Sequence, residues 1–140
     1  MLTARDFSGV WQLERTITDA LNPHAGRFAG TATFAADDAG VLAYIETGKL
    51  LYGDAAPMVA TRRYRWLFAN TGVAVQFANG APFHSFVPAG HAAGTDHPCG
   101  ADFYQVRYDF TCWPQWRATW AVKGPRKNYV SVSHYARAAW

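Results

Sequence analysis

Two histidines, an aspartate and a tyrosine lie close together in the sequence and are of types that could carry acid/base chemistry. They are His84, His97, Asp102 and Tyr104. A histidine whose tautomer is fixed by a carboxylate can transfer protons near neutral pH, and a tyrosine beside it can act as a donor. This pattern predicts, as one hypothesis, a cofactor-free enzyme of the isomerase, cyclase or hydrolase type with these four residues as its candidate catalytic set.

Other interpretations of the same segment stay open. Asp102 could accept hydrogen bonds that hold the long loop 88–100 in place, with Cys99 as a small apolar filler. His84, His97 and Cys99 could bind a metal, although the His-x-Cys spacing is not a standard zinc pattern. Cys99 could also act as a nucleophile. Among these alternatives we expect no metal site and no cofactor.

The elements that must position these residues are strands, because apolar and polar residues alternate with a period of two along most of the chain. Strands are expected near 10–18, 26–35, 42–52, 58–69, 73–77, 81–86, 102–112, 116–122 and 129–137. About eight to ten short strands with tight turns predict an all-β fold, a single antiparallel up-and-down β-barrel. Closure removes edge strands, and such a barrel can hold side chains or one small ligand. We expect one domain over residues 1–140.

The first strand sets the direction of the barrel interior. Gly9 lets the backbone turn, and we expect the Trp11 indole to close one end of the barrel. Alternation then places Arg15 inside, and the more aromatic faces of the other strands give an interior too polar for a plain core. Arg15 and Glu46 could pair with each other and with tyrosines as structural contacts, or they could anchor a ligand. The candidate ligand-binding residues are Arg15, Tyr44, Glu46, Trp66, Tyr108, Trp120, Tyr129 and Lys127.

Two further features admit a functional and a structural interpretation. The Gly124-Pro125-Arg126-Lys127 turn could bind a phosphate or carboxylate at the barrel mouth, or it could be a solvated hairpin tip. His134 could in principle ligate a haem iron, but its strand face is opposite to the one assigned inward.

Composition limits the classes of partner. Net charge is +3, and the only runs of basic residues are Arg62-Arg63 and Arg126-Lys127, so we expect no nucleic-acid partner. No apolar run approaches the ~20 residues of a membrane span. Two cysteines and the absence of an apolar leader predict a cytoplasmic protein with free thiols. The aromatic share of 16% requires a thick core or a lined cavity.

Several motifs together resemble a known family. They are Phe7-x-Gly9-x-Trp11 with Arg15, Tyr44-x-Glu46, Asn79-Gly80-x-x-Phe83-His84, His97-x-Cys99-x-x-Asp102-x-Tyr104, Trp120-x-Val122-x-Gly124-Pro125-Arg126-Lys127-x-Tyr129 and Tyr135-x-Arg137. This set resembles the uncharacterised DUF6314 family over nearly the whole chain. The Gly-x-Trp start with a late arginine is also similar to the calycin group, which includes lipocalins and fatty-acid-binding proteins. The resemblance implies a lipocalin-like barrel in which Arg137 packs across Trp11, and it implies no particular activity.

The sequence therefore predicts a cytoplasmic small-molecule-binding barrel with an aromatic-lined cavity, whose ligand is aromatic or amphipathic. The acid/base enzyme is the alternative, and it requires at least one of the two histidines to face the cavity and to hydrogen-bond Asp102. A third interpretation is a small partner-binding domain with a filled core. The oligomeric state, including a homodimer, is left open.

Overall fold

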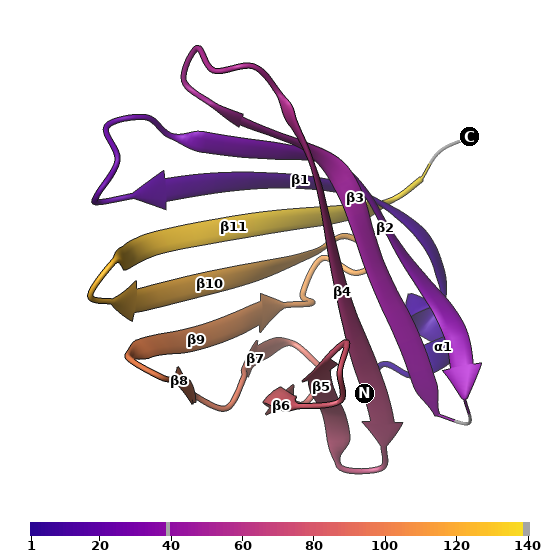
Figure 1. The fold of residues 1–140 in the computed structure, drawn as a ribbon. Coiled ribbons are helices and arrows are strands. Elements are labelled where there is room, and N and C mark those ends of the chain that lie inside the picture. Colours follow the sequence, from indigo (N-terminus) through magenta and orange to yellow (C-terminus); the bar gives the residue numbers. More distant parts are fainter. Residues whose placement is uncertain (39, 139–140) are drawn as a thin grey trace.

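The computed structural model describes residues 1–38 and 40–138, which form one short helix and an eleven-stranded antiparallel sheet. The elements are α1 (Ala4–Phe7), β1 (Gly9–Asp19), β2 (Gly26–Asp38), β3 (Val41–Tyr52), β4 (Met58–Ala69), β5 (Gly72–Phe77), β6 (Pro82–Phe86), β7 (His91–Ala93), β8 (His97–Cys99), β9 (Asp102–Asp109), β10 (Trp116–Gly124) and β11 (Lys127–Arg137). The sheet coils into a barrel (Figure 1). The all-β, up-and-down barrel expected from the sequence is confirmed.

The order of the strands explains why the barrel is nearly closed. Neighbours run β6-β5-β4-β3-β2-β1-β11-β10-β9-β7, with β8 paired to β9, so the last long strand returns beside the first. The two ends of this order meet at β6 and the segment after β7. There the backbone N–H of Thr95 donates to the Ser85 carbonyl at 2.9 Å, and the Ser85 N–H donates to Thr95 Oγ1 at 3.0 Å. Among the described residues, two hydrogen bonds rather than a ladder close this seam.

Alternation in β1 orients the interior. Trp11, Leu13, Arg15 and Ile17 are buried, whereas the residues between them are exposed. A strand with one face on a core and one face in water is expected to show this pattern. β2 and β3 also approach closely where Gly30 faces Gly48. The approach is so close that a Cβ on Gly30 would collide with the Thr47 carbonyl oxygen.

One end of the barrel is closed by an aromatic plug. Phe7, at the end of α1, is fully buried and its ring contacts other aromatic rings at 5.1–5.8 Å, among them Trp113 and Trp116. The Trp11 indole N–H donates to the Phe7 carbonyl at 2.8 Å. The Arg137 guanidinium lies 3.9 Å from the Trp11 ring centroid and donates to the backbone carbonyls of Ser8 and Asp6. Helix α1 thus belongs to the plug.

Two features of the fold were not predicted. Helix α1 has four residues, which is too short to show a 3.6-residue period. The expected loop 88–100 contains the three-residue strands β7 and β8, both of which pair with β9. Among the residues described, no helix is long and apolar enough to cross a membrane.

Candidate ligand-binding cavity

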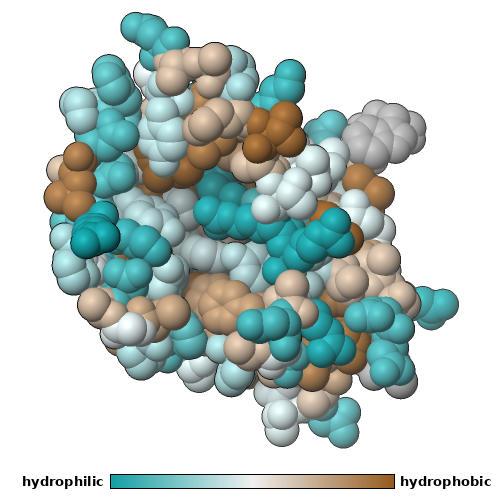
Figure 2. Space-filling model, in the orientation of Figure 1, coloured by the Kyte–Doolittle hydropathy of each residue, from teal (hydrophilic) through white to brown (hydrophobic). Residues whose placement is uncertain are grey.

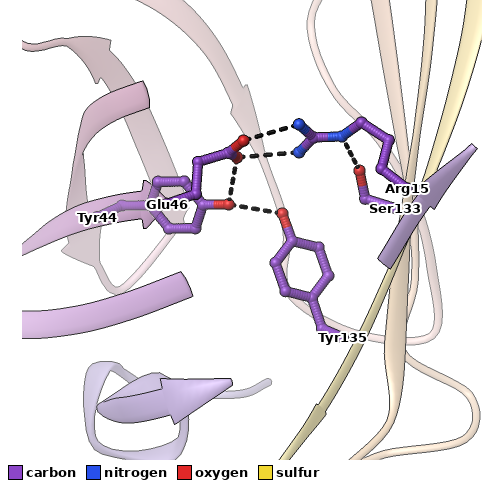
Figure 3. Close-up of polar contacts among 5 residues, drawn as sticks. All are labelled: Arg15, Tyr44, Glu46, Ser133 and Tyr135. Carbon is purple, nitrogen blue, oxygen red and sulfur yellow. Dashed lines mark hydrogen bonds and ion pairs between the residues drawn. The ribbon is translucent and has the colours of Figure 1, made fainter. Parts of the chain in front are cut away.

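A buried ion pair lies in the middle of the barrel (Figure 3). Arg15 on β1 donates to both carboxylate oxygens of Glu46 on β3, at 2.7 and 2.9 Å. The Arg15 Nε also donates to Ser133 Oγ at 2.6 Å, and the Tyr44 hydroxyl donates to Glu46 at 2.7 Å. The hydroxyls of Tyr44 and Tyr135 are 2.8 Å apart. Three strands therefore contribute to one connected network in which both charges have partners.

The network fixes the protonation of its members. Burial alone would raise the pKa of Glu46, but the hydrogen bonds and charge of Arg15 lower it below its ordinary value. Burial opposes the charge on Arg15, yet its hydrogen bond to Glu46 raises the pKa of the guanidinium above its ordinary value. Burial, followed by the Glu46 charge, raises the pKa of Tyr135 to about 12. At neutral pH the pair is ionised and the tyrosine is protonated.

A cavity of about 260 Å³ opens at the end of the barrel opposite the plug. Figure 2 shows a hollowed face with both hydrophilic and hydrophobic side chains around the hollow. We call this space the mouth cavity, and it is lined by Arg15, Ile17, Asp19, Phe28, Glu46, Leu50, Tyr52, Ala60, Arg62, Arg126, Lys127 and Tyr129. These residues come from β1 to β4, from β11 and from the turn between β10 and β11.

A second, much smaller void of about 20 Å³ lies deeper in the barrel. We call it the inner void, and it is lined by Arg15, Tyr44, Glu46, Tyr64, Trp66, Val75, Phe83, His84, Tyr108, Ala118, Trp120 and Tyr135. That volume is about the size of one water molecule, for which ~10–15 Å³ suffices. Arg15 and Glu46 line both spaces, so the ion pair separates the mouth cavity from the inner void.

His84 is buried at the inner void. Its Nε2 is 2.8 Å from the Tyr108 hydroxyl, whereas its Nδ1 has no hydrogen-bond partner among the described residues. Burial, with a smaller contribution from the charge of His97, lowers the pKa of His84 to about 3. The side chain is therefore a neutral imidazole at physiological pH, packed between the rings of Phe83 and Phe86.

The other three members of the acid/base set lie nearer the mouth. Asp102 forms an ion pair with the Lys127 ammonium group at 3.2 Å, and this ammonium group also donates to the Tyr104 hydroxyl at 3.2 Å. His97 faces Tyr104 across the β8–β9 pair, with its ring 5.3 Å from Phe83. In residues 1–38 and 40–138 neither His84 nor His97 hydrogen-bonds to Asp102, which is the contact that the enzyme hypothesis requires.

The predicted ligand-binding residues divide between the two spaces. Lys127 and Tyr129 line the mouth cavity, and Arg15 and Glu46 line both spaces. Tyr44, Trp66, Tyr108 and Trp120 line only the inner void. Arg62 and Arg126 also line the mouth cavity. The sequence prediction of ligand-binding residues does not include Arg62, and it includes Arg126 only as part of the Gly124-Pro125-Arg126-Lys127 turn. The alternation that points Tyr64 and Trp66 inward also points Arg62 inward, so the signal for Arg62 was present.

The residues considered for metal or haem lie apart. Within the described part of the chain, no group of three or more histidine, cysteine or acidic side chains is placed to hold a metal ion. Cys99 is exposed, whereas His84 is buried. His134 is exposed on the outside of β11, opposite Glu14 and Arg117.

Fold and site together define a lipocalin-like β-barrel that is plugged at one end and carries a polar-rimmed cavity at the other. The chain belongs to the family of unknown function DUF6314, whose family model matches residues 7–137. No curated protein matches the sequence.

Solved structures share the fold at low sequence identity. The S-type phycobiliprotein lyase of Guillardia theta is similar with a TM-score of 0.70 and 11% identity, over 98% of this chain and 91% of that one. A protein of unknown function from the DUF3598 family of Nostoc punctiforme gives 0.61 and 15%, over 96% of this chain but only 48% of that one. A redesigned β-barrel, mFAP1, bound to DFHBI gives 0.51 and 13%, over 96% and 98%.

Proposed function

We propose that this protein is a cytoplasmic small-molecule-binding barrel, acting as one unit over residues 1–140, whose aromatic or amphipathic ligand occupies the mouth cavity. The observation that carries the proposal is the position of this cavity. It provides about 260 Å³ directly outside a buried aromatic core, while Phe7 and Trp11 fill the other end. Because about 260 Å³ is slightly below the ~300–1,000 Å³ that ligand pockets usually measure, the ligand should be small, such as a compound of a few fused rings or a short amphipathic chain.

The wall of the cavity supports the same class of ligand. Phe28, Leu50 and Tyr129 offer apolar and aromatic surface, and the ion pair of Arg15 and Glu46 forms the polar floor. An apolar wall with a few fixed polar groups is typical of small-molecule sites. Because both floor charges are already satisfied by each other, a ligand need not neutralise either of them.

The comparisons and the cysteines support the proposal in a coarser way. One similar barrel was determined bound to DFHBI, so an architecture of this kind can hold a bound compound. Cys99 and Cys112 are both free thiols, as expected in a reducing compartment. We propose no nucleic-acid and no membrane partner, since the excess positive charge is small and forms no long run.

Native mass spectrometry of the protein purified from the cells in which it occurs is the first test. The native mass is compared with the denatured mass. An adduct of a few hundred daltons that is lost on denaturation is expected, and its mass would lead to the ligand. The same spectrum gives the oligomeric state. Absence of any such adduct argues against tight storage or transport, and the test then depends on the probe experiment below.

The probe experiment asks whether the mouth cavity itself binds. We expect the neutral aromatic alcohol 9-anthracenemethanol to bind saturably, followed by its fluorescence. Ala60 is half-buried in the cavity wall, so A60W should fill the space and abolish binding. Ala74 is exposed on β5 and lies outside the cavity, so A74W is the matched control and should bind as the wild type does. Equal binding by A60W and the wild type would contradict the proposed location.

A further inference from the structure

The charge of the mouth cavity is one-sided. Four cationic side chains line it, Arg15, Arg62, Arg126 and Lys127, against two carboxylates, Asp19 and Glu46. Arg15 and Glu46 neutralise each other in a two-point ion pair. The Asp19 carboxylate accepts the backbone N–H of Leu21 at 2.9 Å, which holds its own loop and leaves its negative charge in the balance of four cations against two carboxylates. Positive charge therefore remains in excess at the rim.

Two of the rim cations have no carboxylate. Across residues 1–38 and 40–138, neither Arg62 nor Arg126 is within ion-pair distance of an acidic group. The Arg62 guanidinium lies 5.5 Å from the centroid of the Trp120 ring, which orients it without neutralising it. Lys127 does have a carboxylate, Asp102 at 3.2 Å.

The field of Arg62 reaches across the cavity. Burial raises the pKa of Tyr129, and the charge of Arg62 is the largest effect that opposes the rise. The same charge adds to the lowering of the pKa of Glu46 that Arg15 produces. Arg62 is on β4 and Tyr129 is on β11, so an anion between these strands would meet the same favourable potential.

We infer that the ligand of the mouth cavity carries an anionic group, a carboxylate or a phosphate, which Arg62, Arg126 and Lys127 bind at the rim. Its apolar body then rests against Phe28 and Leu50. This inference rests on the proposed function, because it names the chemistry of a ligand at that same cavity. Guanidinium groups suit carboxylate and phosphate oxygens, since they present paired N–H donors in one plane.

A pair of matched probes tests the inference. Anthracene-9-carboxylate and 9-anthracenemethanol share a ring system and differ in charge. We expect the carboxylate to bind about tenfold or more tightly. A charge-assisted hydrogen bond contributes about twice as much free energy as a neutral one, and that difference corresponds to about tenfold in affinity. The advantage should shrink as NaCl is raised from about 50 to about 500 mM, because salt screens exposed charges.

Variants locate the effect. R62Q and R126Q should each weaken the carboxylate about fivefold to tenfold and leave the alcohol within about twofold. R63Q is the matched control. Arg63 follows Arg62 on β4, is exposed and points to the outer face of the barrel. The same loss of charge there should leave the affinity for both probes unchanged. Circular dichroism checks that each variant folds.

The outcomes separate the two claims. If both probes bind equally and R62Q and R126Q change neither affinity, the inference of an anionic group is wrong, whereas the proposed binding cavity is still supported. An equal effect of R63Q would also overturn the inference, because the preference would then reflect net charge alone. If neither probe binds to the wild type or to any variant, the proposed function itself fails.

Discussion

Buried His84 should make the protein lose stability as the pH falls from 7 to 5, in a way that one substitution removes. The folded protein holds the pKa of His84 at about 3 because the ring is buried, while the unfolded chain has the ordinary value of 6.5. Between these values the unfolded state binds a proton that the folded state does not. By linkage, unfolding then becomes easier as the pH falls.

The expected size follows from these two values. At pH 5 the unfolded histidine is almost fully protonated and the folded one almost fully neutral. The free energy of unfolding should therefore be about 2 kcal/mol lower at pH 5 than at pH 7 from this residue alone. Carboxylates contribute little in this range, because Asp and Glu in the unfolded chain titrate near ~4. A positive charge on His97 acts in the same direction, because it also lowers the pKa of His84.

Urea unfolding at pH 7, 6 and 5, followed by tryptophan fluorescence, measures the effect in the wild type, H84Q and H134Q. H84Q removes the titrating group and keeps a side chain that can hydrogen-bond Tyr108. His134 is exposed on the outer face of β11, so H134Q is the matched control. We expect H84Q to lose about 2 kcal/mol less than the wild type between pH 7 and 5, and H134Q to behave as the wild type. Equal losses in the wild type and H84Q would refute the reasoning.

Three other predictions, which use four variants, give separable results. E46Q leaves the buried Arg15 charge without its counter-ion and should lower the free energy of unfolding in urea by about 3–5 kcal/mol. Replacing both residues in R15M/E46L should lower it much less. A similar loss in both variants would contradict the explanation by a buried charge pair. R137A removes a cation–π contact and two hydrogen bonds to backbone carbonyls, so a loss of about 2 kcal/mol is expected from thermal unfolding, and an unchanged midpoint would show that the plug does not need it. G30A places a Cβ against the Thr47 carbonyl oxygen and should prevent normal folding, visible as lost near-ultraviolet circular dichroism, and a native-like spectrum would rule out the close approach.

The barrel itself could be predicted because its signal is local. In β1, Trp11 and Arg15 point inward simply because side chains alternate along a strand. The up-and-down order also follows from short turns between consecutive strands. Helix α1 could not be predicted in this way, because four residues are too few to show a helical period. The Asp6 carboxylate accepts the Thr3 backbone N–H at its start, and Phe7 contacts rings from distant strands at its end.

The site was harder to predict because it depends on which strands become neighbours. Alternation placed Arg15 and Glu46 inside but could not decide that they pair, since that depends on the register of β1 on β2 and of β2 on β3. Asp102 follows His97 closely in sequence, yet its carboxylate pairs with Lys127, which is brought near by the β9-β10-β11 order. Proximity in the sequence suggests a histidine as the partner of Asp102, whereas the pairing of β9, β10 and β11 brings Lys127 to it.

The aromatic plug has a consequence for exchange kinetics if the mouth cavity binds a ligand. With Phe7 and Trp11 filling the far end, arrival and departure share the mouth as their route in the part of the chain that the structure describes. An incoming molecule cannot push the resident one out from behind, so replacement must proceed through release followed by capture. In a stopped-flow chase, the observed exchange rate should then stay constant as the competitor concentration rises, limited by dissociation alone. A barrel of this kind sets the residence time of its ligand independently of how much of a rival is present.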